Sequence, residues 1–208
     1  VTGRLAEVMQ TAPQALLDCY GANIPEAEII NNSVHNYLYG AYSGKAVVIA
    51  NLVPALTAGL AVSALPVVAE SFAQGNRLRT QRSVQMVLRI TTIVCIPAGL
   101  GISALAQEVC ELFFGYNSEV AIGAPLLQVL AIASIFIALT AAINSLLQAV
   151  GRVSLPVKLI LIGSLVKLAM NYILVGIPQI NIQAAPWSTL ACYLLVTVLS
   201  LIALRQSV

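Results

Sequence analysis

Residues Ala124–Leu147 read APLLQVLAIASIFIALTAAINSLL and contain no charged side chain. A helix needs about 20 apolar residues to cross a hydrocarbon core about 30 Å thick. This run is long enough for one crossing, and it lacks the alternation of apolar and polar residues that marks a barrel strand. Because backbone groups in lipid must be bonded within their own segment, the run predicts a transmembrane helix.

Four further apolar runs have the same character. The five predicted spans are about Ala46–Ala69, Val87–Ala106, Ala124–Leu147, Pro156–Ile177 and Pro186–Leu204. The composition agrees, since 59% of the 208 residues are hydrophobic and only 9% are charged, whereas soluble domains carry about 25% charged residues. The sequence therefore predicts an all-α integral membrane protein, with a bundle of about five transmembrane helices over residues 46–208.

Residues 1–45 differ from the rest of the chain. They carry charged side chains and the polar stretch Ile29–Ser33 (IINNS), and they contain no apolar run long enough to cross a bilayer. We therefore expect an extracytoplasmic segment with short helices at the membrane interface. The chain begins at Val1 without a signal-peptide pattern, so we also expect it to be a piece of a longer protein.

The charges between the runs predict an orientation. If each run crosses once, one side of the membrane receives Glu70 and five arginines, which are Arg77, Arg79, Arg82, Arg152 and Arg205. The other side receives two basic and seven acidic residues. Because arginine and lysine are enriched in cytoplasmic loops, we predict a multi-pass plasma-membrane protein with a cytoplasmic C-terminus. The loop arginines Arg77, Arg79, Arg82 and Arg152 are expected to contact lipid headgroups or to set the topology.

Lys167 is the most informative charged residue because it stands in the middle of the fourth run. A charge at the bilayer centre costs about 2.5–3.5 kcal/mol on insertion scales. Asn171 follows one helical turn later on the same face. Such a lysine either faces a water-filled cavity, where it attracts a pyrophosphate or a carboxylate, or it bonds to carbonyl groups of a neighbouring helix. The sequence leaves both readings open.

Two more polar residues inside the runs are candidates for substrate binding, together with Lys167 and Asn171. Arg89 lies within a turn of the cytoplasmic end of its run, where its side chain can reach either headgroups or a substrate. Asn51 precedes Pro54 by three residues. It can bond a carbonyl group that the proline leaves free, or it can line a cavity.

Catalytic and metal-binding patterns are missing from the sequence. The four cysteines, Cys19, Cys95, Cys110 and Cys192, lack zinc-site spacing, and His35 is the single histidine. The net charge of +2 gives no indication of a nucleic-acid partner. We expect no enzyme activity, no metal and no cofactor.

Several stretches that follow one another along the chain carry a likeness to a known family. They are Leu38–Ala46 (LYGAYSGKA), Arg89–Gly115 (RITTIVCIPAGLGISALAQEVCELFFG), Leu147–Arg152 (LQAVGR), Lys167–Val175 (KLAMNYILV) and Asn181–Thr189. In this order they resemble helices eight to twelve of the polysaccharide-exporter branch of the MOP flippase superfamily. The resemblance is to the stage V sporulation protein B group and its MurJ-type relatives.

The resemblance implies that the chain is part of a C-lobe, with N-lobe helices on the same longer chain or on a partner. It also implies a bacterial-type flippase that moves a lipid-linked oligosaccharide or peptidoglycan precursor by alternating access, with a lipid-linked sugar pyrophosphate and membrane lipid as partners. One alternative is a multidrug or cation antiporter of the same superfamily, which would favour acidic residues within the spans. Another is a truncated membrane scaffold that does not transport.

Overall fold

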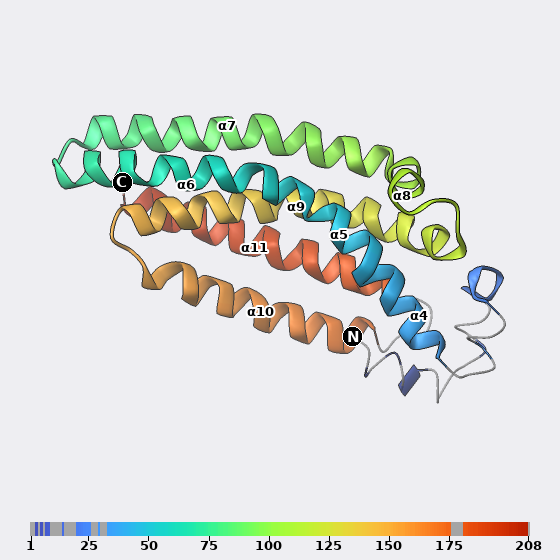
Figure 1. Cartoon of the computed structure of the whole chain (residues 1–208). Coiled ribbons are helices and arrows are strands. Elements are labelled where there is room, and N and C mark those ends of the chain that lie inside the picture. The colour runs from blue at the N-terminus through green and yellow to red at the C-terminus, as the bar shows by residue number, and fades with distance from the viewer. Residues whose placement is uncertain are drawn as a thin grey trace.

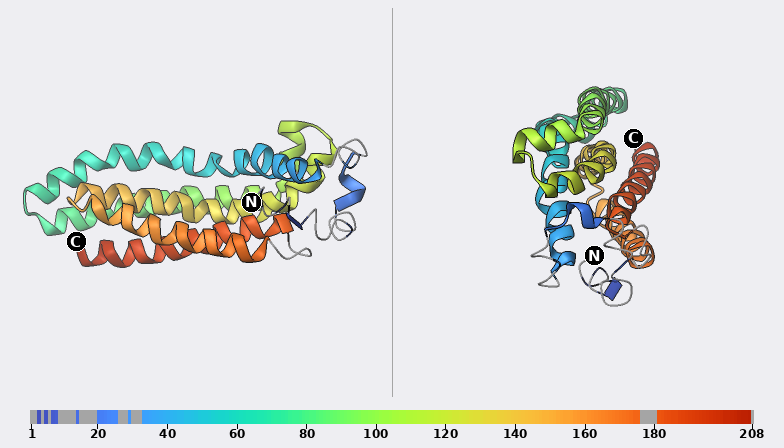
Figure 2. Two further views of the ribbon diagram at one scale, coloured as in Figure 1. Left: turned by 90° about the horizontal axis from the view of Figure 1, so that it is seen from below. Right: turned by 90° about the vertical axis from the view of Figure 1, so that its right-hand side faces the viewer.

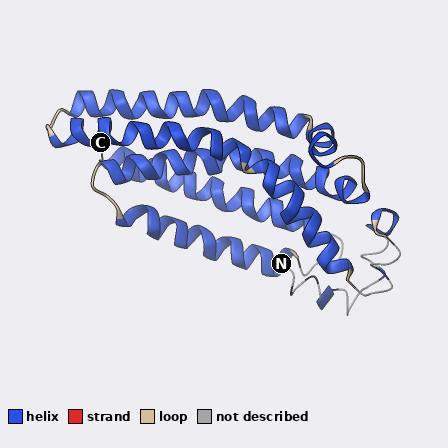
Figure 3. Ribbon diagram, in the orientation of Figure 1, coloured by secondary structure: helices blue, strands red, loops and turns tan. Residues whose placement is uncertain are grey.

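A computed structural model describes residues 33–175 and 181–207 continuously, together with residues 20–25 and a few separate positions earlier in the chain. The regular elements in these ranges are helices (Figure 1, Figure 3). Five helical stretches are long and apolar enough to cross a membrane, which confirms the predicted fold class. They are Val34–Ala73, Arg77–Ala104, Ser118–Ala149, Ser154–Leu174 and Asn181–Ser207.

The first long helix consists of four consecutive segments. They are α4 (Val34–Gly40), the π-helical turn η2 (Ala41–Ala46), α5 (Val47–Ala50) and α6 (Leu52–Ala73). Pro54 explains the interruption at Asn51, because a proline has no N–H to donate to the carbonyl oxygen of Ala50. The first long helix begins at Val34. It is therefore 12 residues longer at its N-terminus than the predicted span, which begins at Ala46. Most of residues 1–32, where short interfacial helices are expected, lie outside the described residues.

The other long helices are α7 (Arg77–Ala104), α9 (Ser118–Ala149), α10 (Ser154–Leu174) and α11 (Ala184–Ser207). They run up and down one common axis (Figure 1, Figure 2). The short helix α8 (Ala106–Phe114) turns across the end of the bundle, and the 3-10 turn η3 (Asn181–Gln183) leads into α11. α10 ends at Leu174, and the predicted end of its span at Ile177 falls outside the described residues.

The central helix is α9, which packs against α6, α7 and α11 and, near its N-terminus, against η2 and α8. Within its most apolar stretch 61% of the residues are buried by protein, compared with 6% in α10, which packs mainly on α11. At about 1.5 Å per residue α9 is about 48 Å long, so it extends beyond a hydrocarbon core of about 30 Å.

Two glycines mark close approaches between helices. A Cβ atom on Gly99 of α7 would overlap the Ile135 side chain and lie 2.9 Å from the Ala131 carbonyl oxygen of α9. A Cβ atom on Gly163 of α10 would overlap the Val196 side chain of α11. Small residues let membrane helices approach closely, and Gly99 and Gly163 serve this purpose at these two positions.

The two ends of the bundle differ in charge. The α6–α7 turn, the α9–α10 turn and the C-terminal end of α11 lie together at one end (Figure 1). We call it the basic end, because it carries Arg77, Arg79, Arg82, Arg152 and Arg205. The opposite end, formed by α8 and the start of α9, is called the elbow end. The structure thus brings the loop arginines together, as the single-crossing prediction requires.

Candidate functional site

Lys167 lies in the middle of α10, on the face that packs against α11. Its side chain is half-buried, and the Cys192 side chain of α11 faces α10 one turn away, beside Gly163. Gly163 lies one turn earlier and allows the two helices to approach at this level. In the described part of the chain, no carboxylate lies within ion-pair distance of Lys167. A cation in an apolar helix is therefore left without a protein counter-charge there.

Asn171 lies one turn after Lys167 and also faces α11, as the helical spacing predicts. Its Oδ1 atom accepts a hydrogen bond of 2.7 Å from Ser188 Oγ. Ser188 is buried, and its Oγ atom also lies 2.9 Å from the Ala185 carbonyl oxygen. Asn171 thus joins α10 to α11, and this contact leaves its side-chain amide N–H groups for a further partner.

The other two candidate substrate-binding residues lie apart from Lys167. Asn51 is exposed at the junction of α5 and α6, and its backbone N–H donates to the Val47 carbonyl oxygen at 3.0 Å. Arg89 is exposed on α7. Neither α6 nor α7 forms a close pair with α10, so the structure does not gather all four residues at one point.

The loop arginines Arg77, Arg79, Arg82 and Arg152 are all exposed. Arg77 and Arg79 stand in the first turn of α7, where the helix dipole disfavours a positive charge by about 0.3–1 kcal/mol per residue. Asn76 caps this helix, since its Oδ1 atom accepts a hydrogen bond of 3.1 Å from the Arg79 backbone N–H. Helix stability therefore does not explain the arginines, and their contact with lipid headgroups or role in setting the topology stays a prediction.

Sequence reasoning missed Lys45, which lies in the π-helical turn η2. Only 8% of this residue is exposed. Its Nζ atom lies 2.7 Å from Glu119 Oε2 and donates a hydrogen bond of 2.7 Å to Asn117 Oδ1. It also lies 5.5 Å from the centre of the Phe114 ring, within cation–π range. The ammonium group is thus neutralised and bonded on several sides.

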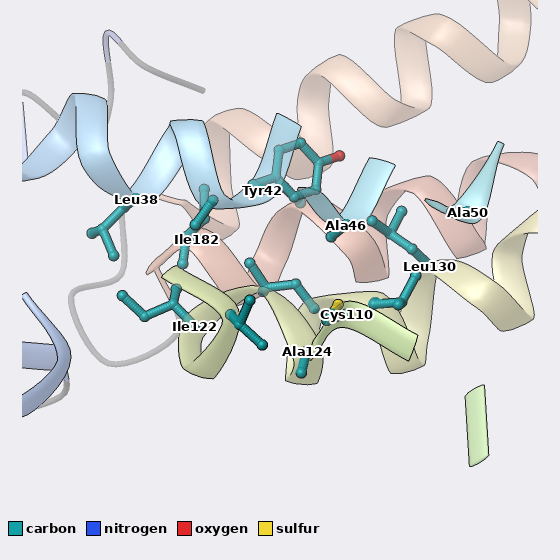
Figure 4. Close-up of a cluster of buried hydrophobic side chains, with 14 of the residues drawn as sticks. Leu38, Tyr42, Ala46, Ala50, Cys110, Ile122, Ala124, Leu130 and Ile182 are labelled. Atoms are coloured by element: carbon teal, nitrogen blue, oxygen red, sulfur yellow. The ribbon is translucent and has the colours of Figure 1, made fainter. Parts of the chain in front are cut away.

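This ion pair ties the first long helix to the start of α9. Asn117 also caps α9, because its Oδ1 atom accepts a hydrogen bond of 3.1 Å from the Val120 backbone N–H. Around the ion pair, buried apolar side chains from the first long helix, α8, α9 and η3 form a cluster that includes Leu38, Cys110 and Ile182 (Figure 4). A π-helical turn often marks a functional position. In the sequence, Lys45 is simply the last charged residue of the segment 1–45. Its distance from Glu119 along the chain gives no indication that the two side chains pair.

Burial raises the pKa of the Cys110 thiol on α8, while the nearby Lys45 ammonium lowers it and Glu111 raises it. Burial is the largest of these causes, so the thiol stays protonated at neutral pH. Within the described residues, no group of three or more His, Cys, Asp or Glu side chains is placed to hold a metal ion.

Comparison with known proteins places these features in a family. The sequence profile of the MatE family matches residues 41–173. "Lipid II flippase MurJ" of Bacillus subtilis (strain 168) is 26% identical over 137 residues, which make up 65% of this chain and 24% of that protein. The chain therefore spans about a quarter of the length of this relative. No solved structure matches the chain.

Proposed function

The chain belongs to the MatE family, and from this premise we propose that it forms part of a flippase for a lipid-linked oligosaccharide or peptidoglycan precursor. The substrate class comes from the lipid II flippase that it resembles. The remaining helices, including an N-lobe, would belong to the same longer chain or to a partner. Transport would proceed by alternating access, in which one helical lobe moves against the other across the substrate site.

The observation that carries this proposal is the position of Lys167. An unpaired charge at this depth costs about 2.5–3.5 kcal/mol, and a diphosphate group in a wet cavity would offset that cost. α10 packs on α11, and most of its remaining surface is exposed. Further helices of a complete carrier would cover this surface, and Lys167 lies beside it. Lys167 would attract the pyrophosphate, and Asn171 would offer it an amide donor.

The same proposal includes an orientation. The basic end would face the cytoplasm, where the loop arginines Arg77, Arg79, Arg82 and Arg152 would meet anionic headgroups. The C-terminus at Val208 would then be cytoplasmic, and the elbow end with Lys45 would face outward. No chemical step on the substrate is proposed.

The test is to replace Lys167 in the intact carrier and measure flipping of a lipid-linked pyrophosphate in reconstituted vesicles. Hydrogen bonds to charged groups contribute about 1.5–3 kcal/mol, so Lys167→Gln should lower transport about 10- to 100-fold. Lys158→Gln is the matched control, because Lys158 is exposed near the basic end of the same helix and should not affect transport. Unchanged transport and unchanged substrate affinity in Lys167→Gln would remove Lys167 from the site.

The alternatives make different predictions in the same vesicles. In the described residues, Glu70 and Glu119 lie in the last turn of α6 and the first turn of α9, so neither stands in the middle of a span. This placement favours the flippase over an antiporter that binds its coupling cation on a carboxylate within the spans. An antiporter would move drugs in one direction as protons or sodium ions move down their gradient in the other, without a lipid-linked substrate. A scaffold would move neither.

A further inference from the structure

A groove of about 640 Å³ runs between α7 and α11 at the basic end. Both helices pack on α9, one on each side of it, and they form no close pair with each other (Figure 2). Val84 of α7 and Leu204 of α11 line the groove, and both also belong to the buried cluster that contains Ile143 and Leu147 of α9. The buried side chains of Val84 and Leu204 thus join the groove to the core that α9 shares with both helices.

The lining of this groove changes from polar to apolar along its length. α7 begins at the basic end and α11 ends there, so the depth of each residue follows from its position in its helix. Gln81 and Arg205 lie near the basic end, while Leu88, Leu201 and Val198 lie one to two turns deeper. A membrane lipid has the same order, with a polar headgroup at the surface and an apolar chain below it.

The charge at the mouth of the groove selects the headgroup. Arg205 is exposed, and in the described part of the chain no carboxylate lies within ion-pair distance of it. The side chains that line the groove include no acidic residue. A guanidinium group binds phosphate oxygens in a bidentate manner, and Gln85 adds an amide donor one turn into the groove.

We infer that this groove binds one anionic phospholipid, whose phosphate pairs with Arg205 and whose acyl chain lies along Leu88, Leu201 and Val198. The occupant is a lipid of the bilayer and not the transported substrate, so the inference stands independently of the proposed function. The arginines of the loops meet headgroups at the surface, whereas Arg205 is joined to a groove that holds the chain as well.

A tryptophan reporter in the groove tests the inference. Trp187 is the single tryptophan of the chain and lies at the elbow end. The reporter protein therefore carries Trp187→Phe with Leu201→Trp. Its matched control carries Trp187→Phe with Ile160→Trp, because Ile160 is an exposed apolar residue of α10 at a similar distance from the basic end. Each protein is placed in phosphatidylcholine vesicles that contain brominated phosphatidylglycerol or brominated phosphatidylcholine.

A basic residue near the membrane surface contributes about 1 kcal/mol to the binding of an anionic lipid, which corresponds to about a fivefold preference. Brominated phosphatidylglycerol should therefore compete about fivefold better than brominated phosphatidylcholine for the site beside Leu201→Trp. The preference should be weaker at Ile160→Trp, where Lys158 lies nearby but the lipid meets an exposed helix surface instead of a groove, and Arg205→Gln should lower the preference at the groove to that level.

Four results would overturn the inference. The first is equal quenching by the two lipids at the groove, and the second is an equal preference at both reporters. The third is an unchanged preference at the groove in Arg205→Gln. A Leu201→Trp reporter that neither lipid quenches would also count against it, because it would show that a protein segment covers the groove.

Discussion

Lys45 and Lys167 are two lysines in apolar helices, and they differ in burial and in the partners of their ammonium groups. Lys45 is buried and is paired with Glu119, Asn117 and the Phe114 ring. Lys167 is half-buried, and the structure shows no carboxylate beside it within the described residues. The two lysines differ in their partners and not in residue type.

The difference teaches how to separate a structural charge from a functional one in a membrane helix. A buried ion pair that satisfies its hydrogen bonds offsets the cost of removing both charges from water, and it fixes two elements in one arrangement. A charge without such partners has to meet water, backbone carbonyl groups or a ligand of opposite charge. We therefore interpret Lys45 as a structural link between the first long helix and α9, and Lys167 as the candidate contact for an anionic substrate.

The largest effect on stability is expected for Asn117→Ala. This change removes the cap of α9 and the hydrogen bond from Lys45, which together should lower the free energy of unfolding by about 1.5–3 kcal/mol. Asn76→Ala is the matched control, because Asn76 Oδ1 caps α7 through the same kind of hydrogen bond, 3.1 Å from the N–H three residues on, and no lysine bonds to it within the described residues. It should cost about 1 kcal/mol. Equal losses in a denaturant titration would show that the bond to Lys45 contributes nothing.

The next effect concerns the ion pair itself. Glu119→Gln should lower the free energy of unfolding by about 1–2 kcal/mol, less than a fully buried pair, because the Glu119 side chain is 40% exposed. Lys45→Met combined with Glu119→Gln should recover most of this loss, since no unpaired charge then remains. A double-mutant cycle measures the coupling, and a coupling energy near zero would refute the structural link.

A smaller loss of stability is expected when the hydrogen bond beside Lys167, between Ser188 and Asn171, is removed. Ser188→Ala removes the donor to Asn171, and hydrogen bonds between membrane helices contribute about 0.6 kcal/mol on average. The free energy of unfolding should fall by about that amount, well below the loss in Asn117→Ala. A loss as large as that of Asn117→Ala would mean that the α10–α11 contact is a second structural link and would weaken the contrast.

The smallest change is a chemical one at Cys110. Burial raises the pKa of this thiol and the Lys45 ammonium lowers it, so removing Lys45 should raise that pKa further. The thiolate fraction at any given pH should then fall, and maleimide labelling of Cys110 should be slower in Lys45→Met than in the native protein. Comparing the labelling rate of the two proteins between pH 7 and pH 9 checks this, and faster labelling in the variant would show that the link also seals the thiol.

Much of the fold follows from the sequence alone. Long apolar runs predict the five spans, and the loop arginines predict which helix ends lie together. The start of the first helix at Val34 was missed because Gly40, Ser43 and Gly44 lower the local hydropathy, although the π-helical turn keeps that stretch helical. The interruption at Asn51 follows from Pro54, whose position the sequence shows, because proline cannot donate a hydrogen bond to Ala50.

The candidate site was only partly predictable. Helical spacing places Lys167 and Asn171 on one face, but the partner Ser188 lies on another helix that the spacing does not reveal. Lys45 was missed for the same reason, since Asn117 is 72 residues away in the chain. Contacts between distant segments depend on how the helices pack, and hydropathy carries no information about them.

Amine labelling of the native lysines tests the contrast most directly. The chain has three, Lys45, Lys158 and Lys167, and a water-soluble acylating reagent followed by peptide mass spectrometry reports each one separately. With exposed Lys158 as the reference, Lys167 in the reconstituted carrier should react and should be protected by a lipid-linked pyrophosphate, while Lys45 should stay unmodified. Modification of Lys45 as fast as Lys158, or a Lys167 that never reacts, would contradict the account.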